Sequence, residues 1–433
     1  MARTLTPLDA HAIMNELVQQ ATGQKSITAV DTSSFVSAGE LVLSTGVENT
    51  LNALSLIIGR TLVAVRPYDA KLKIINALDT GLYTHRLRKI SFYSKDALPA
   101  GHFNTDLYTN FAEGYDNGSN GATGSTPATH STGSQYEQHA AIPLQLNFAG
   151  SSVWQDALTR YEWQLQQAFR DETSFNQFIA GVMTEKGNDI ESQKEAFNRM
   201  TLLNRIAGAV DMNADGAIIN LTKAFNDYYD LDTPYTTAEL LTTHFTEFLE
   251  FFIAEFKIIS DRLTYRTAAY HSAPTISGHH LLRHTPKSKQ RCIMYNPFFV
   301  KAEAMVKPAI FNDQYLDIGT QFEAVDFWQN PASPSEIDIT PAIVDLDTTH
   351  TSTYGTQIQG SNVNLDYLLG VLYDEDAVMT DFQLEAVRTS PIEARKGYST
   401  TWFSFSKNSI SDWSENFVVF YMADPAESEG SGT

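Results

Sequence analysis

Residues 370–424 read GVLYDEDAVMTDFQLEAVRTSPIEARKGYSTTWFSFSKNSISDWSENFVVFYMAD and carry the clearest structural signal in the chain. Three apolar-rich runs lie in or next to this segment, at 368–373, 398–405 and 416–422, and turn-forming clusters separate them. The middle run is crowded with aromatic side chains, and nothing in the segment has the order of a catalytic loop. Such runs are typical of strands with broad side chains, so we predict a small sheet built to pack.

The chain has 433 residues, which suffice for more than one core or for one elongated subunit of several parts. Hydrophobic residues make up 42% of it, aromatic residues 11% and charged residues only 19%. This composition suits a surface that partners cover, because interface cores lose charge and gain aromatic residues. A large enzyme with polar, uncharged loops fits it equally well. The net charge of −21 argues against general affinity for nucleic acid, which needs Lys and Arg.

Cys292 is the only cysteine, so an internal disulfide is excluded and a reducing compartment fits. It stands in an apolar run, which favours a buried structural thiol over a nucleophile. The N-terminus, MARTLTPLDAHAIM, lacks the pattern of a signal peptide. Gly59 and Arg60 interrupt the apolar stretch 54–65, so we expect no bilayer span and a protein that is cytosolic when made.

Hydrophobic periodicity predicts helices and strands in mixed order, and therefore an α+β fold. The helices are expected at 6–20, 45–60, 154–212 (with an interruption at 187–188 and an ambiguous stretch at 161–169), 236–269 and 297–311. The strands are expected at 62–65, within 82–110, and at 142–148, 292–295 and 322–328, with extended chain at 26–46 and a loop or edge hairpin at 330–364.

Residues 114–135 form a low-complexity segment in which Gly, Ser, Thr and Asn dominate. Such a segment buries too little apolar surface to offset the entropy of ordering, so we expect an exposed, mobile loop. Strand-like sequence on either side predicts a long two-stranded arm. Because an isolated hairpin is marginal in water, the arm is expected to lie on a neighbouring subunit.

Asp211, Asn213 and Asp215, followed by Gly216, match the opening of a calcium-binding loop. Thr222 stands where such a loop needs its bidentate carboxylate, which lowers the expected affinity sharply. The same residues are typical of a turn that ends a helix, and this interpretation is favoured.

Four histidines cluster within 271–284, next to the basic run LRHTPKSKQR at 282–291. Leu281 stands where a zinc-protease motif needs a glutamate, and the basic neighbours disfavour a bound cation. An exposed basic loop is the favoured interpretation, facing solvent, nucleic acid or an acidic neighbour.

The acidic residues 374–376 follow an apolar run, where they suit a turn and a helix N-terminus better than a catalytic pair. No Gly-Lys-Ser/Thr phosphate-binding loop and no Gly-x-Ser-x-Gly elbow is present in the sequence. We therefore expect no catalytic residue and no cofactor.

Several segments, in their order and spacing, resemble the major capsid proteins of tailed bacteriophages. The closing segments are Asp-Glu-x-Ala at 374–377, Glu-x-Val-Arg at 385–388, Ala-x-x-Gly-Tyr-x-x-x-Trp at 394–402 and Asn-Phe-Val-Val-Phe at 416–420. The earlier ones are ITAVDTSSFVSAG at 27–39, TGVENTLNALS at 45–55, RTLVAVRPY at 60–68 and YNPFF at 295–299. Together they span nearly the whole chain.

The resemblance implies the parts of the tailed-phage capsid fold. Residues 1–44 would be the N-terminal arm, 45–79 a helix and strand leading onward, and 80–152 the extended loop with its flexible tip at 114–135. Residues 153–290 would be the peripheral domain with a long spine helix, 291–424 the axial domain with returning strands, and 425–433 a disordered tail.

The function so implied is structural: the protein would form a shell. Subunits made in the bacterial host would assemble into pentamers and hexamers that form an icosahedral or prolate head around double-stranded DNA, without sequence-specific binding and without catalysis. The partners would be other copies, a scaffolding protein, a portal and a decoration protein, with no membrane. The expected contacts between subunits are Tyr398, Trp402, Phe403, Phe405 and Trp413.

Two other functions stay open. One is another virion protein or a self-assembling compartment shell, which a neighbouring cargo gene instead of portal and terminase genes would indicate. The other is a soluble hydrolase or calcium-dependent binding module that uses 271–284 or Asp211–Asp215, which predicts monomers with bound metal.

Overall fold

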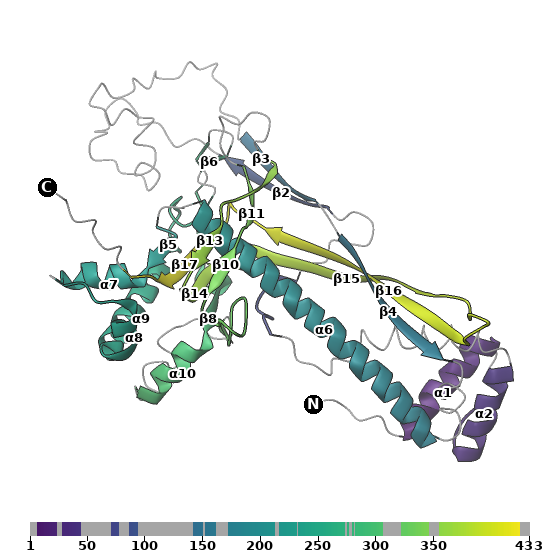
Figure 1. Ribbon diagram of the computed structural model, residues 1–433. Helices are drawn as coiled ribbons and strands as arrows, with labels where there is room; N and C mark the ends of the chain where they lie inside the picture. The colour runs from purple at the N-terminus through teal and green to yellow at the C-terminus, as the bar shows by residue number, and fades with distance from the viewer. Residues whose placement is uncertain are drawn as a thin grey trace, which may run out of the picture.

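A 40-residue helix, α6 (Glu172–Asp211), joins the two ends of an elongated molecule (Figure 1). A sheet surrounded by helices lies at one end, and α1 (Pro7–Thr22) and α2 (Thr32–Ser44) lie at the other. The fold is α+β, as predicted. This computed structural model describes residues 7–23, 28–44, 71–77, 86–93, 142–149, 152–161, 172–212, 216–231, 233–272, 275–276, 279–280, 282–305, 322–345 and 355–424.

A five-stranded sheet forms the core of the first end, in the order β5-β17-β14-β8-β9. Its strands are β5 (Ile218–Asn220), β8 (Gln290–Tyr295), β9 (Phe322–Val325), β14 (Tyr367–Asp374) and β17 (Phe417–Met422). β14 pairs antiparallel with β17 and β8, and the outer pairs β17–β5 and β8–β9 are parallel. β14 and β17 are two of the predicted apolar runs and are buried along nearly their whole length, as continuous apolar runs require.

Helix α9 (Phe245–Arg262) packs on this sheet through a row of phenylalanines. The rings of Phe252 and Phe256 lie 6.1 and 5.7 Å from the ring of Phe420 in β17. Helices α7 (Leu221–Tyr229), α8 (Thr237–Thr242) and α10 (Asn296–Met305) lie around the same sheet (Figure 1).

The single helix predicted over 236–269 is divided into α8 and α9 and ends at Arg262. The N–H groups of Thr243 and His244 both donate to the carbonyl of Glu239, which turns the chain before α9 begins. The apolar periodicity continues across this turn, so the sequence pattern alone did not reveal it.

A four-stranded sheet in the order β1-β15-β16-β4 lies along α6 (Figure 1). Its strands are β1 (Asn76–Ala77), β4 (Ser152–Tyr161), β15 (Val378–Thr389) and β16 (Tyr398–Ser411). The three apolar runs therefore do not share one sheet, because β16 belongs here. The sequence predicts turns where β15 lies, because the many polar side chains of this strand form no apolar run.

The helix predicted over 154–212 is wrong at its start, because residues 152–161 form β4 and α6 begins at Glu172. β4 pairs with β16 along its whole length, from Tyr161 opposite Tyr398 to Ser152 opposite Lys407. This pairing overrides the local sequence preference. The predicted interruption at 187–188 is also absent, and α6 passes through it as one helix.

The extended chain predicted at 26–46 is wrong, because residues 32–44 form α2. Asp31 caps it: its Oδ1 accepts from the Ser34 N–H at 2.8 Å, and the Ser34 hydroxyl accepts from the Asp31 N–H at 3.0 Å. Phe35, Ala38 and Val42 then recur at helical spacing and are buried. The Ser and Thr residues that suggested a strand therefore act at a helix start. The helix predicted at 6–20 is confirmed as α1.

β2 (Arg86–Tyr93) and β3 (Ile142–Ala149) form an antiparallel hairpin, which confirms the predicted strands on either side of the low-complexity segment.

The region 330–364 contains two short ladders, β10 (Ile337–Ile339) with β13 (Val363–Leu365) and β11 (Ala342–Val344) with β12 (Gln357–Gln359). The predictions for 45–60, 62–65, 114–135 and 306–311 fall outside the described residues.

Candidate interaction surfaces

Three of the five aromatic residues predicted at subunit contacts are buried within the chain itself. Phe403, Phe405 and Trp413 are at most 7% exposed. The Lys186 ammonium of α6 lies 5.5 Å from the centre of the Phe403 ring, so this side of β16 faces α6. Trp402 points the other way and is 43% exposed. Of the five, only Trp402 and the partly exposed Tyr398 are available to a partner.

We call the side of the four-stranded sheet that points away from α6 the outer sheet face. Alternate residues of a strand share one face, and the register places Tyr398 opposite Tyr161 and Trp402 opposite Ala157 on this side. The rings of Tyr161 and Tyr398 meet edge to face, with centroids 6.1 Å apart. Tyr161 is 40% exposed and lies toward the same end. The outer sheet face thus carries aromatic surface that the chain leaves uncovered.

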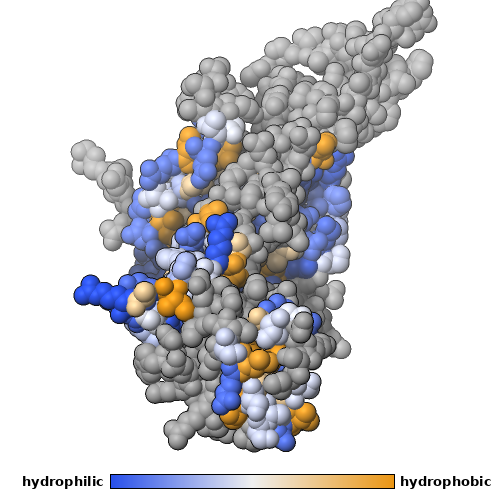
Figure 2. All heavy atoms as spheres, turned by 90° about the vertical axis from the view of Figure 1, so that its right-hand side faces the viewer, coloured by the Kyte–Doolittle hydropathy of each residue, from blue (hydrophilic) through white to orange (hydrophobic). Residues whose placement is uncertain are grey.

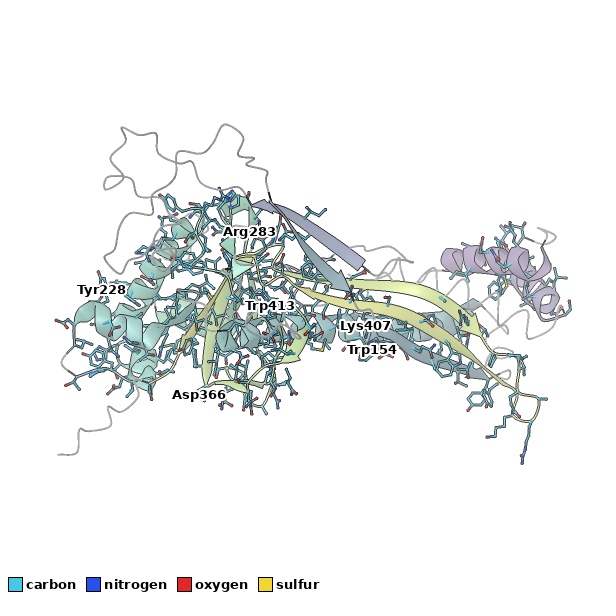
Figure 3. The ribbon with its side chains drawn as sticks, turned by 90° about the horizontal axis from the view of Figure 1, so that it is seen from above. Trp154, Tyr228, Arg283, Asp366, Lys407 and Trp413 are labelled. Carbon is cyan, nitrogen blue, oxygen red and sulfur yellow. The ribbon has the colours of Figure 1, made fainter. Side chains whose placement is uncertain are left out.

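Residues 390–397 connect β15 to β16 and form what we call the hairpin tip. The tip is held by backbone hydrogen bonds: Glu393 donates to the Tyr398 carbonyl at 2.9 Å, and Gly397 donates to the Glu393 carbonyl at 2.8 Å. Gly397 has φ +60°, which a residue with a Cβ adopts at a cost. Figure 3 shows the tip extending past the end of the sheet with long side chains pointing outward.

Lys89 anchors the β2–β3 hairpin to the rest of the molecule. Its ammonium lies 2.5 Å from Asp412 Oδ2 and also pairs with Glu415, both in the turn between β16 and β17. Arg283 Nε lies 3.4 Å from Glu415 on another side. We call the cluster of Lys89, Asp412 and Glu415 the hairpin anchor, because it holds the β2–β3 hairpin. The side chains of Asp412 and Glu415 are 1% and 10% exposed, so water screens the charges of this cluster little.

The Lys89 ammonium of the hairpin anchor is charged at neutral pH, and burial raises the pKa of Glu415. Burial opposes the charge on Lys89, but the carboxylates of Asp412 and Glu415 outweigh it and raise the pKa of Lys89 above its ordinary value. More than three hundred residues separate Lys89 from its partners in the chain, so no local sequence pattern indicates this contact.

Arg205 of α6 fixes the turn that carries these carboxylates. Its guanidinium lies 4.5 Å over the rings of Trp413 and Phe417 and donates to the carbonyl of Glu415 at 3.4 Å. Burial lowers the pKa of Arg205 to about 9, which leaves it charged at neutral pH. Trp413 thus packs in the core of this chain.

The basic run at 282–291 is paired with carboxylates of its own chain. Lys287 lies 2.6 Å from Asp261, and Lys289 and Arg291 lie 3.2 and 2.6 Å from Glu375. Glu375 belongs to the acidic group that was predicted to begin a helix. The predicted turn is confirmed, but no helix begins there, because this turn joins β14 to β15.

Two weak candidates for a metal site came from the sequence, and the turn and the basic loop were the favoured interpretations. Asp211 Oδ1 accepts from the Ser361 N–H at 3.1 Å, and the positions of Asn213 and Asp215 lie outside the described residues. The histidines His279–His280 form the short strand β7, paired with β6 (Thr275–Ile276), rather than a helix. Across the residues that the structure describes, no group of three or more His, Cys, Asp or Glu side chains is placed to hold a metal ion.

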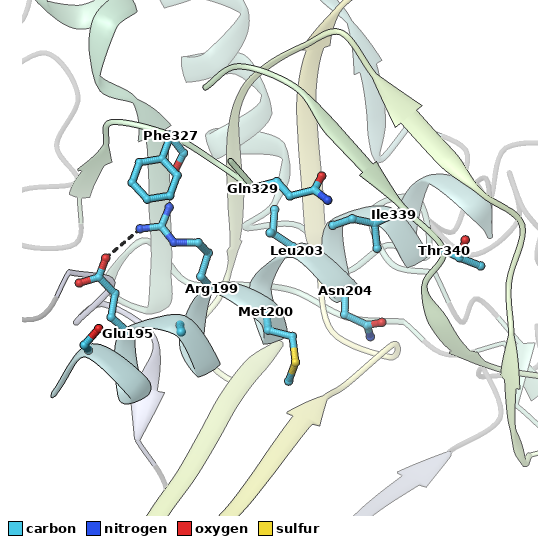
Figure 4. A pocket seen from close by; sticks show the side chains of 11 residues that line it. Glu195, Arg199, Met200, Leu203, Asn204, Phe327, Gln329, Ile339 and Thr340 are labelled. Carbon is cyan, nitrogen blue, oxygen red and sulfur yellow. Dashed lines mark hydrogen bonds and ion pairs between the residues drawn. The ribbon is translucent and has the colours of Figure 1, made fainter. Parts of the chain in front are cut away.

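A groove of about 680 Å³ lies between α6 and the segment before β10 (Figure 4). Arg199 crosses it, with its guanidinium 3.8 Å from the centre of the Phe327 ring and 2.8 Å from Glu195. The residues that line it include no histidine, cysteine or lysine. The charges of Arg199 and Glu195 pair with each other, so this groove offers no unpaired charge to a ligand.

The sequence led us to expect a buried structural cysteine and no segment that spans a bilayer. Cys292 is buried in β8, and burial raises the pKa of its thiol, so it stays protonated as a structural cysteine. Within the described part of the chain, no helix is long and apolar enough to cross a membrane.

No protein-family model matches the chain, and no curated protein matches it. Among solved structures, it is similar to the capsid of Staphylococcus phage Andhra, with 11% identity and a TM-score of 0.47, over 83% of this chain and 86% of that one. Cyanophage P-SCSP1u gives 10% identity and a TM-score of 0.40 over 82% and 89%, and the mature capsid of bacteriophage PhiM1 gives 10% and 0.39 over 82% and 87%.

These structures are phage capsids, the class of protein that the sequence resembles. All three TM-scores lie below 0.5, and all three identities are 11% or less.

Proposed function

We propose that this chain is the major capsid protein of a tailed bacteriophage, a structural subunit that assembles with copies of itself into a closed head around double-stranded DNA. Pentamers and hexamers are its expected units. A scaffolding protein, a portal and a decoration protein are its expected partners, and no reaction is expected of it.

The observation that carries the proposal is the division of the chain into parts that do not form one compact core. The five-stranded sheet at one end and the α1–α2 pair at the other are joined by α6, and the β2–β3 hairpin is attached through the charged hairpin anchor (Figure 1). An elongated subunit of this kind has much surface for its volume. Contacts with several neighbours at once supply the burial that it lacks alone.

The domain boundaries are proposed in a modified form. The axial part would consist of the five-stranded sheet with α7, α8, α9 and α10, because the row of phenylalanines packs α9 on that sheet. The peripheral part would consist of α6 with the four-stranded sheet. The N-terminal arm at 1–44 and the extended loop at 80–152 keep their predicted bounds.

Negative-stain electron microscopy of the purified chain, alone and co-expressed with its genomic neighbours, tests the proposal. Closed shells, tubes or rings of five and six are expected. A uniform monomer under all of these conditions would sink the proposal. Particles that form but enclose a cargo protein in place of DNA would indicate a compartment shell.

A further inference from the structure

Two surfaces of opposite charge lie at the end of the molecule that carries α1 and α2. The first is the hairpin tip, which presents Arg395 and Lys396 to solvent, together with the exposed Arg388 at the end of β15. Within the described residues, none of these three side chains forms an ion pair. They are exposed cations in a chain whose net charge is −21.

The tip presents its cations from an ordered loop. Besides the two backbone hydrogen bonds at Glu393, the Ser390 N–H donates to the Thr400 carbonyl at 2.8 Å, and Ser399 Oγ donates to the Ser390 carbonyl at 2.8 Å. A loop that is already fixed loses little conformational entropy when it binds. The tip is therefore suited to docking.

Aromatic surface lies directly beside these cations. Arg388 is opposite Trp402 in the β15–β16 register, and Tyr398 with Tyr161 lies at the base of the tip on the outer sheet face. Arginine, tryptophan and tyrosine are the residues most often found at the energetic centre of protein interfaces. The combination indicates a protein partner with complementary negative charge.

The second surface is the α1–α2 pair. Glu16, Asp31 and Glu40 are exposed on it, and residues 7–23 and 28–44 contain no lysine or arginine. Hydrogen bonds from Ser34 and Ser33 lower the pKa of Asp31 to about 2, so its carboxylate stays charged at all ordinary pH values. The apolar side of the pair is occupied by Met14, Leu17 and Phe35, which are buried.

The two surfaces lie on different sides of the same end. Figure 3 shows the purple helices α1 and α2 on one side of α6 and the hairpin tip on the other. In Figure 2, which looks onto this end, strongly hydrophilic side chains protrude from the left flank at the place of the tip. A head-to-tail contact joins unlike surfaces of two copies, and such contacts close into rings.

We propose that the hairpin tip and outer sheet face of one copy bind the α1–α2 surface of the next copy. Arg388, Arg395 and Lys396 face Glu16, Asp31 and Glu40 of the neighbour in this contact, and Trp402 lies at its centre. The inference rests on the proposed function in one respect, because it requires the chain to assemble with itself. It assigns one contact of that assembly to named residues.

The test compares charge-reversed variants of the full chain under conditions in which the natural chain assembles. Arg395→Glu with Lys396→Glu is expected to lower the yield of particles at least about tenfold, since each contact that changes sign is repeated throughout the shell. Lys257→Glu with Arg266→Glu makes the same change of charge at exposed positions near the other end and is the matched control. Circular dichroism checks that each variant is folded.

A second variant that reverses the charges on the opposite surface makes the test more specific. Glu16→Lys with Glu40→Lys is expected to impair assembly alone and to restore it when combined with Arg395→Glu and Lys396→Glu, because opposite charges then meet again. Added salt is expected to weaken the natural contact and the restored one alike.

Each outcome decides one point. Equal losses in the tip variant and in its control, or no recovery in the combined variant, would overturn the contact. Loss of packaged DNA with unchanged shells in the tip variant would also overturn it and assign the tip to nucleic acid. A natural chain that never assembles would count against the proposed function, whereas assembly that ignores the tip would count against this contact only.

Discussion

Gly208 makes room for the indole ring of Trp413 inside the folded chain. A Cβ at position 208 would lie 2.2 Å from Cη2 and 2.7 Å from Cζ3 of that ring. We expect Gly208→Ala to lower the free energy of unfolding by about 2 kcal/mol, as overpacking of a core does. Chemical denaturation measures the loss.

Trp413→Phe provides the control for this clash, because phenylalanine lacks the two ring atoms concerned. The double variant is expected to be less destabilised than the sum of the two single variants. Additive losses would mean that the ring and the glycine do not meet as described.

Lys89 gives a second prediction at the scale of single residues. Lys89→Met leaves the carboxylates of Asp412 and Glu415 buried without their main counter-charge, so we expect a loss of stability. The loss should be about 2 kcal/mol, below that of a fully buried pair because 25% of the Lys89 side chain is exposed. Thermal unfolding of the variant against Lys257→Met, which changes an exposed lysine, measures it.

Adding Glu415→Gln to Lys89→Met should recover part of that stability, since one uncompensated carboxylate is then removed. Lack of any recovery would show that the loss in Lys89→Met does not come from an uncompensated carboxylate at Glu415.

Sequence patterns identify residues by type but do not show which residues contact each other in the folded chain. They predicted Trp402 and Tyr398 as contacts together with three aromatic residues that the chain buries, because hydrophobicity does not distinguish a core from an interface. Arg395 and Lys396 were missed, although Pro391 and Gly397 mark a turn between two strands. That turn signal was the available clue to an exposed basic tip.

At the scale of elements, long apolar runs were predicted well and polar ones poorly. β14 and β17 follow directly from continuous apolar sequence, and β2 and β3 from the flanks of a low-complexity segment. β4 was predicted as a helix because its strand character comes from pairing with β16, a partner more than two hundred residues away. α2 was predicted as extended chain because capping residues and strand-forming residues overlap in type.

The cap of α2 provides a prediction about pH. The pKa of Asp31 falls from 3.8 to about 2 because the backbone N–H of Ser34, with the hydroxyls of Ser34 and Ser33, donates to the carboxylate. A lowered pKa means that this stabilisation is complete above pH 3.8 and is lost as the pH falls through about 2.

Asp31→Asn keeps a good capping side chain but does not titrate. The difference in melting temperature between the natural chain and this variant is expected to be small at neutral pH. It should shift in favour of the variant as the pH falls below about 4, because Asp31 of the unfolded natural chain then takes up a proton more readily than Asp31 of the folded one. A difference that stays constant over this range would contradict the capping role.

At the scale of the whole molecule, the β2–β3 hairpin allows a test of the arm. Deleting residues 117–134, within the predicted loop between its strands, is expected to leave the chain folded, because low-complexity sequence of this kind buries little apolar surface. Assembly should be weakened, because an arm that covers a neighbour then loses its end. Electron microscopy counts the particles, and shells as resistant to heat as the natural ones would contradict the arm.

Helix α6 has a mechanical consequence under the proposed function, because copies of the chain then occupy positions of different curvature. A helix of 40 residues is about 60 Å long, and α6 contains no proline that would kink it. Both sheets and the α1–α2 pair are tied to it or to its neighbours. A rotation of a few degrees at the five-stranded sheet is therefore carried to the opposite end as a displacement of several ångströms. In the proposed assembly, small angular differences between neighbouring copies would thus change how far each copy extends.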